Sequence, residues 1–215
     1  MVLQKISKKH IDLMLEKHDL NEGNLVNNSL LKLFSEMNDN KSKYEVSIKV
    51  AALNQLYSTS IMYIKPVVEM IVEKCSFENN KYVELVDEIA VIEWENKSKN
   101  KKYRRNNLSF SSKYVHFLSE YKIPIYDSYI WILLIGYLKE DGVKNISFKP
   151  PTKYIDFYLI FEQFRNRFNI LKDYSIYQID KFLWQYGKNL ILEISDRENV
   201  NLSKAKTILK KKFNK

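Results

Sequence analysis

Glycine, cysteine and proline are all scarce in this chain of 215 residues, which contains 4, 1 and 4 of them respectively. Four glycines are roughly 2% of the chain, against the ~7% that is typical of globular proteins. Turn-dense β-sandwiches and glycine-rich phosphate loops both need more glycine than this. Neither a GxGxxG nor a GxxxxGK[ST] pattern occurs, so enzymes built on nucleotide-binding loops are excluded.

The few cysteines and histidines exclude most metal sites. The single cysteine, Cys75, cannot form an internal disulfide, a four-cysteine zinc site or a cysteine-ligated iron–sulfur cluster. The three histidines (His10, His18 and His116) lack the spacing of metal ligands. We therefore predict a protein with no metal and no small-molecule cofactor.

Long apolar runs are also missing. Charged residues interrupt every long apolar stretch, and the first residues lack the apolar core of a secretory signal. We expect a cytoplasmic protein that does not span a membrane.

Positive charge is what the sequence has in excess. The chain carries 35 Lys and Arg against 26 Asp and Glu, a formal charge of +9 and a pI near 9.3. This excess favours a polyanionic partner, with nucleic acid ahead of a membrane surface, and we expect that partner to be DNA. The alternative is that abundant Lys and Asn reflect only the base composition of the source genome.

The apolar residues follow a helical period. They recur at three- and four-residue steps over Tyr44–Tyr57 and again over Val83–Trp94, and the nearly apolar block Ser60–Cys75 predicts a buried helix that Pro66 starts or kinks. No long alternating pattern indicates a strand. We therefore predict an all-α fold, a compact multi-helix domain with a helix-hairpin-helix-like segment.

The predicted organisation has three parts. Residues 1–43 form a helical N-terminal extension, residues 44–197 form the helical core, and residues 198–215 form a basic tail that frays. The hairpin-like segment covers residues 104–140 of the core. The polar, basic stretch 96–107 is expected to be a surface linker.

Local signals place several helix ends. A helix is expected to begin near Ser111 or Ser112 and to end before Pro124, because the residue before a proline avoids the α region. Asp127 is the expected N-cap of the next helix, and Gly142 closes it. Further along, residues 154–168 are expected to be helical, and residues 175–178 read as a capping box that starts another helix.

Lys113 and Asp127 are the residues most suited to chemistry. Residues 113–121 travel about 12 Å along a helix, and the following residues 121–127 can return up to ~20 Å in extended chain. The spacing therefore allows the two side chains to meet. An amine at a helix N-terminus is favoured in its neutral, nucleophilic form, and a capping carboxylate can stabilise positive charge as a glycosidic bond breaks.

The same residues carry a family resemblance. Ser112-Lys113, followed by Pro124-Ile-Tyr-Asp127-Ser-Tyr-Ile130, resembles the helix-hairpin-helix DNA glycosylases, sharply over residues 108–131 and in arrangement over 45–140. The resemblance implies that Lys113 is the nucleophile and that Asp127 assists departure of the base. The segment is also similar to a group of uncharacterised bacterial proteins with a Ser-Phe-Ala-Ser-Lys…Pro-Ile-Tyr-Asp-Ser pattern.

Other residues complete the expected site. Phosphate contacts are expected from the cations and hydroxyls around the hairpin-like segment, namely Lys97, Lys99, Lys101, Lys102, Arg104, Arg105, Ser111 and Ser112. A pocket for an extruded base is expected from aromatic and amide side chains, namely Asn54, Tyr57, Tyr126, Tyr129 and Trp184.

Two functions follow from the sequence. The first is a DNA glycosylase or glycosylase/AP lyase that acts on a damaged or modified base. The alternative is an inactive helical module that binds nucleic acid or a protein, for example in genome maintenance or phage defence. The absence of glycine from Leu108–Ser112, where the family's hairpin uses it to approach phosphate, favours the second.

Overall fold

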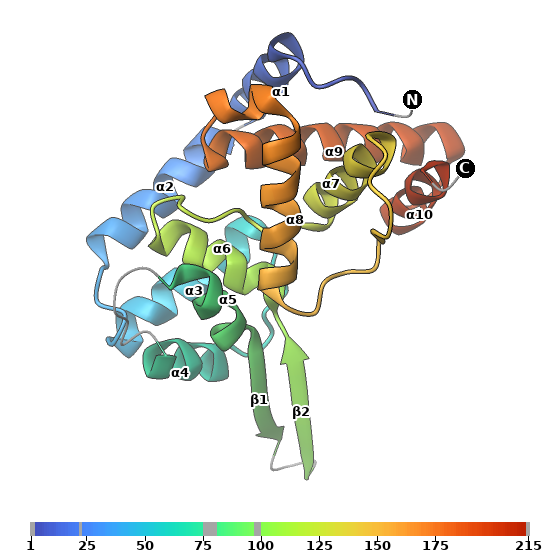
Figure 1. The fold of residues 1–215 in the computed structure, drawn as a ribbon. Helices are drawn as coiled ribbons and strands as arrows, with labels where there is room; N and C mark the ends of the chain where they lie inside the picture. Colours follow the sequence, from blue (N-terminus) through green and yellow to red (C-terminus); the bar gives the residue numbers. More distant parts are fainter. Residues whose placement is uncertain (1–2, 22, 75–80, 97–99, 214–215) are drawn as a thin grey trace. The chain divides into compact units, whose positions relative to one another are not determined.

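The computed structural model describes residues 3–21, 23–74, 81–96 and 100–213, and these ranges are mostly helical (Figure 1). The predicted all-α class is confirmed, with about 70% of residues in helices. The elements of the described ranges are α1 (Lys8–Leu20), α2 (Gly23–Glu36), α3 (Lys43–Tyr57), α4 (Ile64–Lys74), α5 (Tyr82–Ala90), β1 (Val91–Asn96), β2 (Lys101–Asn106), α6 (Leu108–Leu118), α7 (Ser128–Glu140), α8 (Tyr154–Arg167), the 3-10 helix η2 (Asn169–Asp173), α9 (Ile176–Glu198) and α10 (Leu202–Lys212).

The chain divides into two units. Unit 1 comprises Met1–Gly23, Asp127–Pro151 and Phe157–Lys215, and unit 2 comprises Asn24–Tyr126 with Thr152–Asp156. Helices α1 and α10, which the sequence analysis assigned to separate terminal segments, therefore belong to the same unit. None of the helices in the described ranges is long and apolar enough to cross a membrane.

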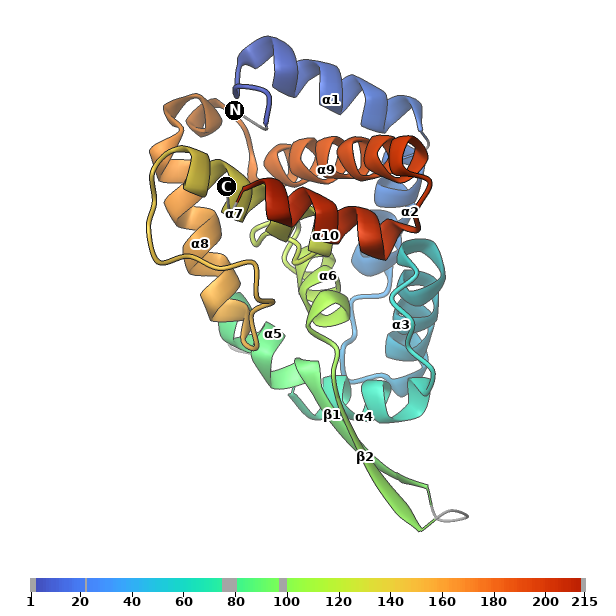
Figure 2. The same ribbon diagram turned by 90° about the vertical axis from the view of Figure 1, so that its right-hand side faces the viewer.

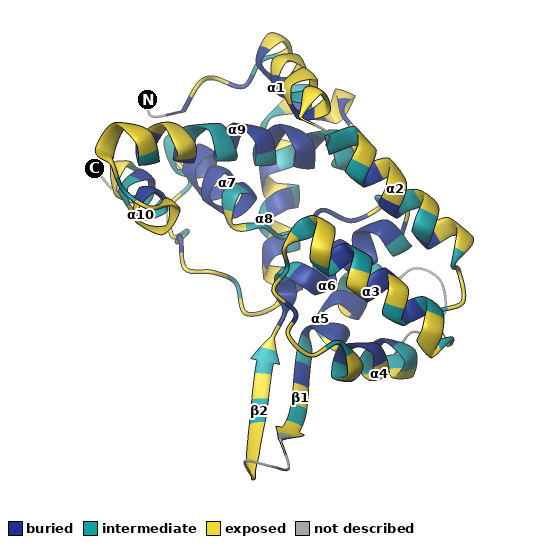
Figure 3. Ribbon diagram, turned by 180° about the vertical axis from the view of Figure 1, so that it is seen from behind, coloured by how far each residue is buried: buried dark blue, intermediate teal, exposed yellow. Residues whose placement is uncertain are grey.

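Unit 1 is organised around α9. This helix lies between α1 and α10 and also packs on α7 (Figure 2). Nine consecutive residues of α7, Ile130–Leu138, are buried, so this helix is enclosed on all sides (Figure 3). At Gly187 of α9, an added Cβ would lie 3.0 Å from Tyr129 Cβ, and the missing side chain therefore permits the close approach of α7 and α9.

Unit 2 contains α2 from Asn24 onward, α3 to α6 and the two strands. Helix α3 packs on α4 and α6, and α5 packs on α6. Much of the interior is apolar, with Val50, Leu53, Ile71, Val86 and Tyr114 all fully buried. Burial of this apolar surface supplies the main stabilisation of the unit.

The principal correction to the sequence analysis is a β-hairpin. The expected linker 96–107 instead contributes β2, and β1 includes Trp94, which was expected to be helical. The strands pair antiparallel, with Trp94 opposite Tyr103 and Glu93 opposite Arg104. The sequence of β2 shows no alternation of apolar and polar residues, because every residue of this strand except Tyr103 is polar.

Several helix ends also differ from expectation. Helix α6 begins at Leu108, three residues before the earlier of its two expected starts. The tail that was expected to fray forms α10, because Ala205 and Leu209 are buried. The cap of α7 by Asp127 and the capping box of α9 at Ser175 are confirmed.

Candidate nucleic-acid interface

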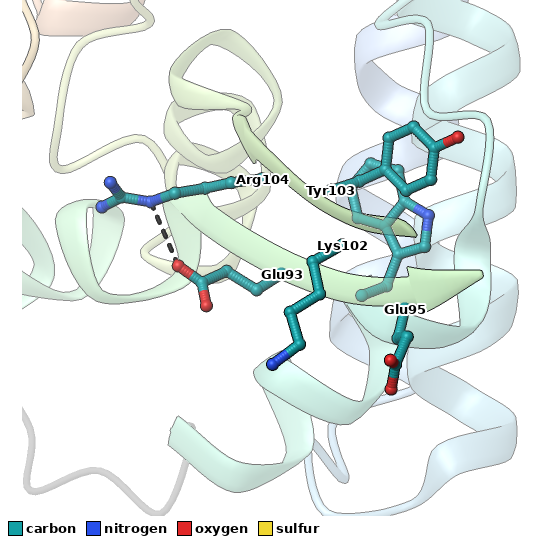
Figure 4. Close-up of a pocket in the computed structure, with 6 residues that line it drawn as sticks. Glu93, Glu95, Lys102, Tyr103 and Arg104 are labelled. Carbon is teal, nitrogen blue, oxygen red and sulfur yellow. Dashed lines mark ion pairs between the residues drawn. The ribbon is translucent and has the colours of Figure 1, made fainter. Parts of the chain in front are cut away.

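The hairpin of unit 2 presents two chemically different faces (Figure 4). Successive side chains of a strand alternate between faces, and paired residues share a face. Glu93, Arg104, Glu95 and Lys102 therefore lie on a charged face, with Glu93 opposite Arg104 and Glu95 opposite Lys102. The Tyr103 ring points away from the Glu93–Arg104 pair. A pocket on the hairpin is lined by Glu93, Trp94, Glu95, Lys102, Tyr103 and Arg104.

Acidic side chains partly offset the cations on the charged face. Glu93 Oε1 lies 3.2 Å from Arg104 Nε, and both side chains are about 70% exposed. Exposed ion pairs are worth ~1 kcal/mol or less, so solvent and a competing anion can readily separate this pair. The charged face can exchange a carboxylate partner for a phosphate at small cost.

The other face carries stacked aromatic rings. The Trp94 and Tyr103 rings are 5.4 Å apart at an interplanar angle of 10°, and the Tyr63 ring lies 5.4 Å from Trp94 at 45°. Tyr63 is half-exposed. The Nζ of Lys101 lies 5.3 Å from the centre of the Tyr103 ring. This face combines flat apolar surfaces with a cation, as sites for unpaired bases do.

The cations of the expected cluster differ in exposure and in their contacts. Arg105 Nη1 donates to the Ser60 backbone oxygen at 2.9 Å, and this hydrogen bond holds the hairpin against the loop before α4. Lys101, Lys102 and Arg104 are exposed. Lys97 and Lys99 lie outside the described residues.

Lys113 is buried in unit 2. Its side chain is on α6, the residue is 4% exposed, and Nζ donates to Ser109 Oγ at 2.7 Å. The amine also lies 5.7 Å from the centre of the Tyr57 ring. Lys113 was expected in the first turn of its helix. Because α6 begins at Leu108, it lies in the second turn instead. The positive field of a helix N-terminus falls off within the first turn, so that part of the sequence argument was wrong.

Ser111 and Ser112, the two hydroxyls expected to contact phosphate, are fully buried. Ser112 Oγ accepts a hydrogen bond from the Tyr126 backbone N–H at 3.0 Å and donates to the Ser109 backbone oxygen at 3.1 Å. These bonds connect the loop after α6 to the start of α6. Ser112 therefore has a structural role in the packing of Tyr126.

Asn54 and Tyr57, two of the expected pocket residues, are half-buried in unit 2 and engaged in hydrogen bonds. The Asn54 side chain donates to the Ile61 backbone oxygen at 3.1 Å and accepts from the Ile61 backbone N–H at 2.8 Å. The Tyr57 hydroxyl donates to Asn27 Oδ1. The Asn54 amide is thus used to hold the turn after α3.

The remaining expected residues lie together in unit 1. Asp127 caps α7 by accepting from the Tyr129 backbone N–H at 2.8 Å, and the Tyr129 ring meets the Trp184 ring edge to face at 6.4 Å. Asp127 belongs to unit 1, whereas Lys113 belongs to unit 2.

A lysine near Asp127 is not among the residues expected from the sequence. Lys206 of α10 donates from Nζ to Ser128 Oγ at 2.8 Å and lies 4.3 Å from the centre of the Tyr129 ring. It lies in the tail that was expected to fray, and no local motif marks it. Among the described residues, no three His, Cys, Asp or Glu side chains are grouped as a metal ion would require.

Comparison with known proteins identifies one family. No curated protein and no solved structure matches the chain. The model of the family HI_0787_N, described as an N-terminal domain, matches residues 2–122. The match covers the hairpin and Lys113 and stops before Asp127. Because it spans more than half of the sequence, the chain belongs to the HI_0787_N family.

Proposed function

We propose that this protein binds DNA through the β1–β2 hairpin. The observation that carries the proposal is the combination of three exposed cations, Lys101, Lys102 and Arg104, with the stacked Trp94–Tyr103 pair on one small exposed element. Cations hold backbone phosphates, and aromatic rings stack on bases. The hairpin offers both kinds of contact within a few residues.

In this proposal the charged face binds phosphates and the aromatic face binds a base. Lys102 and Arg104 on the charged face contact phosphates, which displace the Glu93 carboxylate from Arg104. On the opposite face, an unpaired base stacks at the Trp94–Tyr103 pair, and Lys101 beside Tyr103 neutralises its phosphate. Stacking on an aromatic side chain contributes about 1–3 kcal/mol per base. The net charge of the whole chain adds long-range attraction.

Replacing Lys102 and Arg104 with alanine is expected to weaken DNA binding about tenfold at low salt and to reduce its salt dependence. Each phosphate contact contributes roughly 0.9 to the slope of log K against log salt, so the loss of two contacts lowers the slope by about 2. Fluorescence anisotropy of a labelled single-stranded oligonucleotide, titrated at several salt concentrations, measures both quantities.

The matched control is Lys172→Ala with Lys211→Ala. These exposed lysines belong to η2 and α10, outside the hairpin, and remove the same charge. A general charge effect would weaken binding equally in both double variants. Equal weakening, or no binding by the native chain, would contradict the hairpin proposal.

A second candidate function is excision of a base with Lys113 as the nucleophile. The observation that favours it is the 5.7 Å approach of the Lys113 amine to the Tyr57 ring, which sets a nucleophile beside an aromatic face. In this function the amine attacks the anomeric carbon of the sugar while the bond from that carbon to the base breaks, and the base leaves with a proton. The bond between the same carbon and the ring oxygen then opens, which gives a protonated imine between lysine and sugar.

Borohydride is expected to trap this imine as a covalent protein–DNA adduct when the protein is incubated with DNA that contains an abasic or modified site. Lys113→Gln is expected to abolish trapping at that residue, and Lys122→Gln, an exposed lysine of the same unit, is expected to leave it intact. Peptide mapping by mass spectrometry assigns the adduct. The absence of any adduct on Lys113 would remove this candidate and leave the binding proposal standing.

A further inference from the structure

The β1–β2 hairpin carries its two kinds of side chain back to back. Glu93 and Arg104 form a cross-strand pair on one face, and Trp94 and Tyr103 form the next pair, on the opposite face. The backbone of the hairpin therefore separates the ion pair from the stacked rings (Figure 4). Stacked sheets lie about 10 Å apart, so one such layer with its side chains is about 10 Å thick. A ligand that contacts both faces has to pass on both sides of this layer.

The hairpin projects from the helices of unit 2 (Figure 2). Two contacts attach it to the loop before α4: Arg105 donates to the Ser60 backbone oxygen, and the Tyr63 ring lies against Trp94. The residues of the charged face are all exposed, namely Glu93, Glu95, Lys102 and Arg104. Both faces can therefore be reached by a large ligand.

The two strands carry opposite charges. The exposed charged residues of β1 are Glu93 and Glu95, whereas those of β2 are Lys101, Lys102 and Arg104. A single strand of DNA that reached both faces by turning round β1 would bring its phosphates against the two carboxylates. A turn round β2, over a layer about 10 Å thick, would crowd neighbouring phosphates together, and their mutual repulsion opposes this. One continuous strand is thus poorly suited to fill both faces.

A fork, where a duplex divides into two single strands, suits both faces. In a duplex every base is paired and stacked, and its removal from the stack costs free energy. At a fork an unpaired base is already present, and the two strands already diverge. One strand can follow the charged face while the other passes the Trp94–Tyr103 pair, and neither strand has to turn round an edge of the hairpin.

We propose that the β1–β2 hairpin binds DNA at a fork, with one strand on each face. Lys102 and Arg104 hold the phosphates of the first strand. The first unpaired base of the second strand stacks on the Trp94–Tyr103 pair, and Lys101 neutralises the phosphate beside it. This inference rests on the proposed DNA binding by the hairpin and names the form of DNA that the hairpin selects.

The test compares three DNAs of one sequence: a fork with two unpaired tails, one of its strands alone, and the fully paired duplex. Fluorescence anisotropy with the full chain is expected to show about tenfold tighter binding of the fork than of either other DNA, because stacking of one base changes affinity by about that factor or more. Two further forks carry a stable abasic analogue at the first unpaired position, one on each strand. One of these two is expected to lose the preference.

Two variants assign the effect to the aromatic face. Trp94→Ala is expected to bring the affinity for the fork close to that for the duplex. Tyr44→Ala, which removes an exposed ring of α3 outside the hairpin, is expected to keep the preference. Equal affinity for the fork and the single strand or the duplex, or a preference that survives in both abasic forks, would overturn this inference and leave DNA binding by the hairpin standing. Binding of none of these DNAs would overturn the proposed function as well.

Discussion

Acidification from pH 6.5 to 4 is expected to cost unit 2 about 3 kcal/mol of folding free energy through His116 alone. This side chain is completely enclosed, and its Nδ1 lies 2.6 Å from the Ile123 backbone oxygen. Burial lowers its pKa to about 4; the Ile123 hydrogen bond raises it, and the nearby Lys113 charge lowers it. The folded protein therefore keeps this histidine neutral, with Nδ1–H as the donor.

Stability falls with decreasing pH because the unfolded chain binds a proton at His116 before the folded chain does. In the unfolded chain the imidazole takes up a proton near its ordinary pKa of 6.5, whereas the folded chain does so only near 4. Stability is therefore complete above pH 6.5, declines between the two values and changes no further below pH 4.

Denaturant unfolding of the native chain and of His116→Asn, followed from pH 7 to 4, measures this contribution. Asparagine keeps a donor at the position of Nδ1 and cannot be protonated. The difference in unfolding free energy between the two proteins is expected to shrink or reverse by about 3 kcal/mol over this range. A constant difference would contradict the assignment. His10, whose pKa burial also lowers, contributes equally to both proteins.

Replacing Lys49 with methionine is expected to destabilise unit 2 by about 3 kcal/mol. Lys49 is fully buried, and its Nζ donates to the Met37 backbone oxygen at 2.9 Å and to Asn40 Oδ1 at 2.6 Å. The amine also lies 5.5 Å from the Phe34 ring centre and 5.9 Å from that of Tyr114. It thus holds the connection between α2 and α3 against α6.

The expected cost comes from the acceptors that methionine leaves behind. A buried acceptor without a donor costs about 1–3 kcal/mol, and the substitution withdraws the ammonium from both oxygens. Tyr114 still donates to Asn40 Oδ1. Chemical denaturation measures the change, with Lys43→Met at the exposed start of the same helix as control. A loss of unfolding free energy below 1 kcal/mol, or an equal loss in the control, would show that Lys49 does not hold the connection between α2 and α3.

Local chemistry made much of the fold predictable. The side chains of Asp127 and Ser175 cap α7 and α9 as expected, because a cap depends on residues within one turn. Gly142 adopts a φ of 83° after α7, as expected of a residue that closes a helix. The helical class follows from the three- and four-residue spacing of apolar side chains.

Features that depend on tertiary pairing were not predictable. The hairpin forms only when β1 and β2 pair, and the sequence signal for this pairing is limited to Trp94 and Tyr103, which stack on the same face. The contact of Lys206 with Ser128 joins residues that are far apart in sequence, and nothing near Lys206 indicates its partner. The cationic cluster could be recognised from the sequence, since charge density can be read without knowledge of the fold, and its role in binding phosphate stays a prediction.

The shortage of glycine affects the unfolded chain as well as the folded one. In the described ranges, non-glycine residues occupy left-handed backbone positions at Ser58, Ser60, Asn100, Glu120, Tyr121, Asn145 and Asn199. Glycine would relieve local strain at these turns, but it would also enlarge the number of conformations open to the unfolded chain. A chain that closes its turns with Asn, Ser and Tyr therefore loses less conformational entropy when it folds.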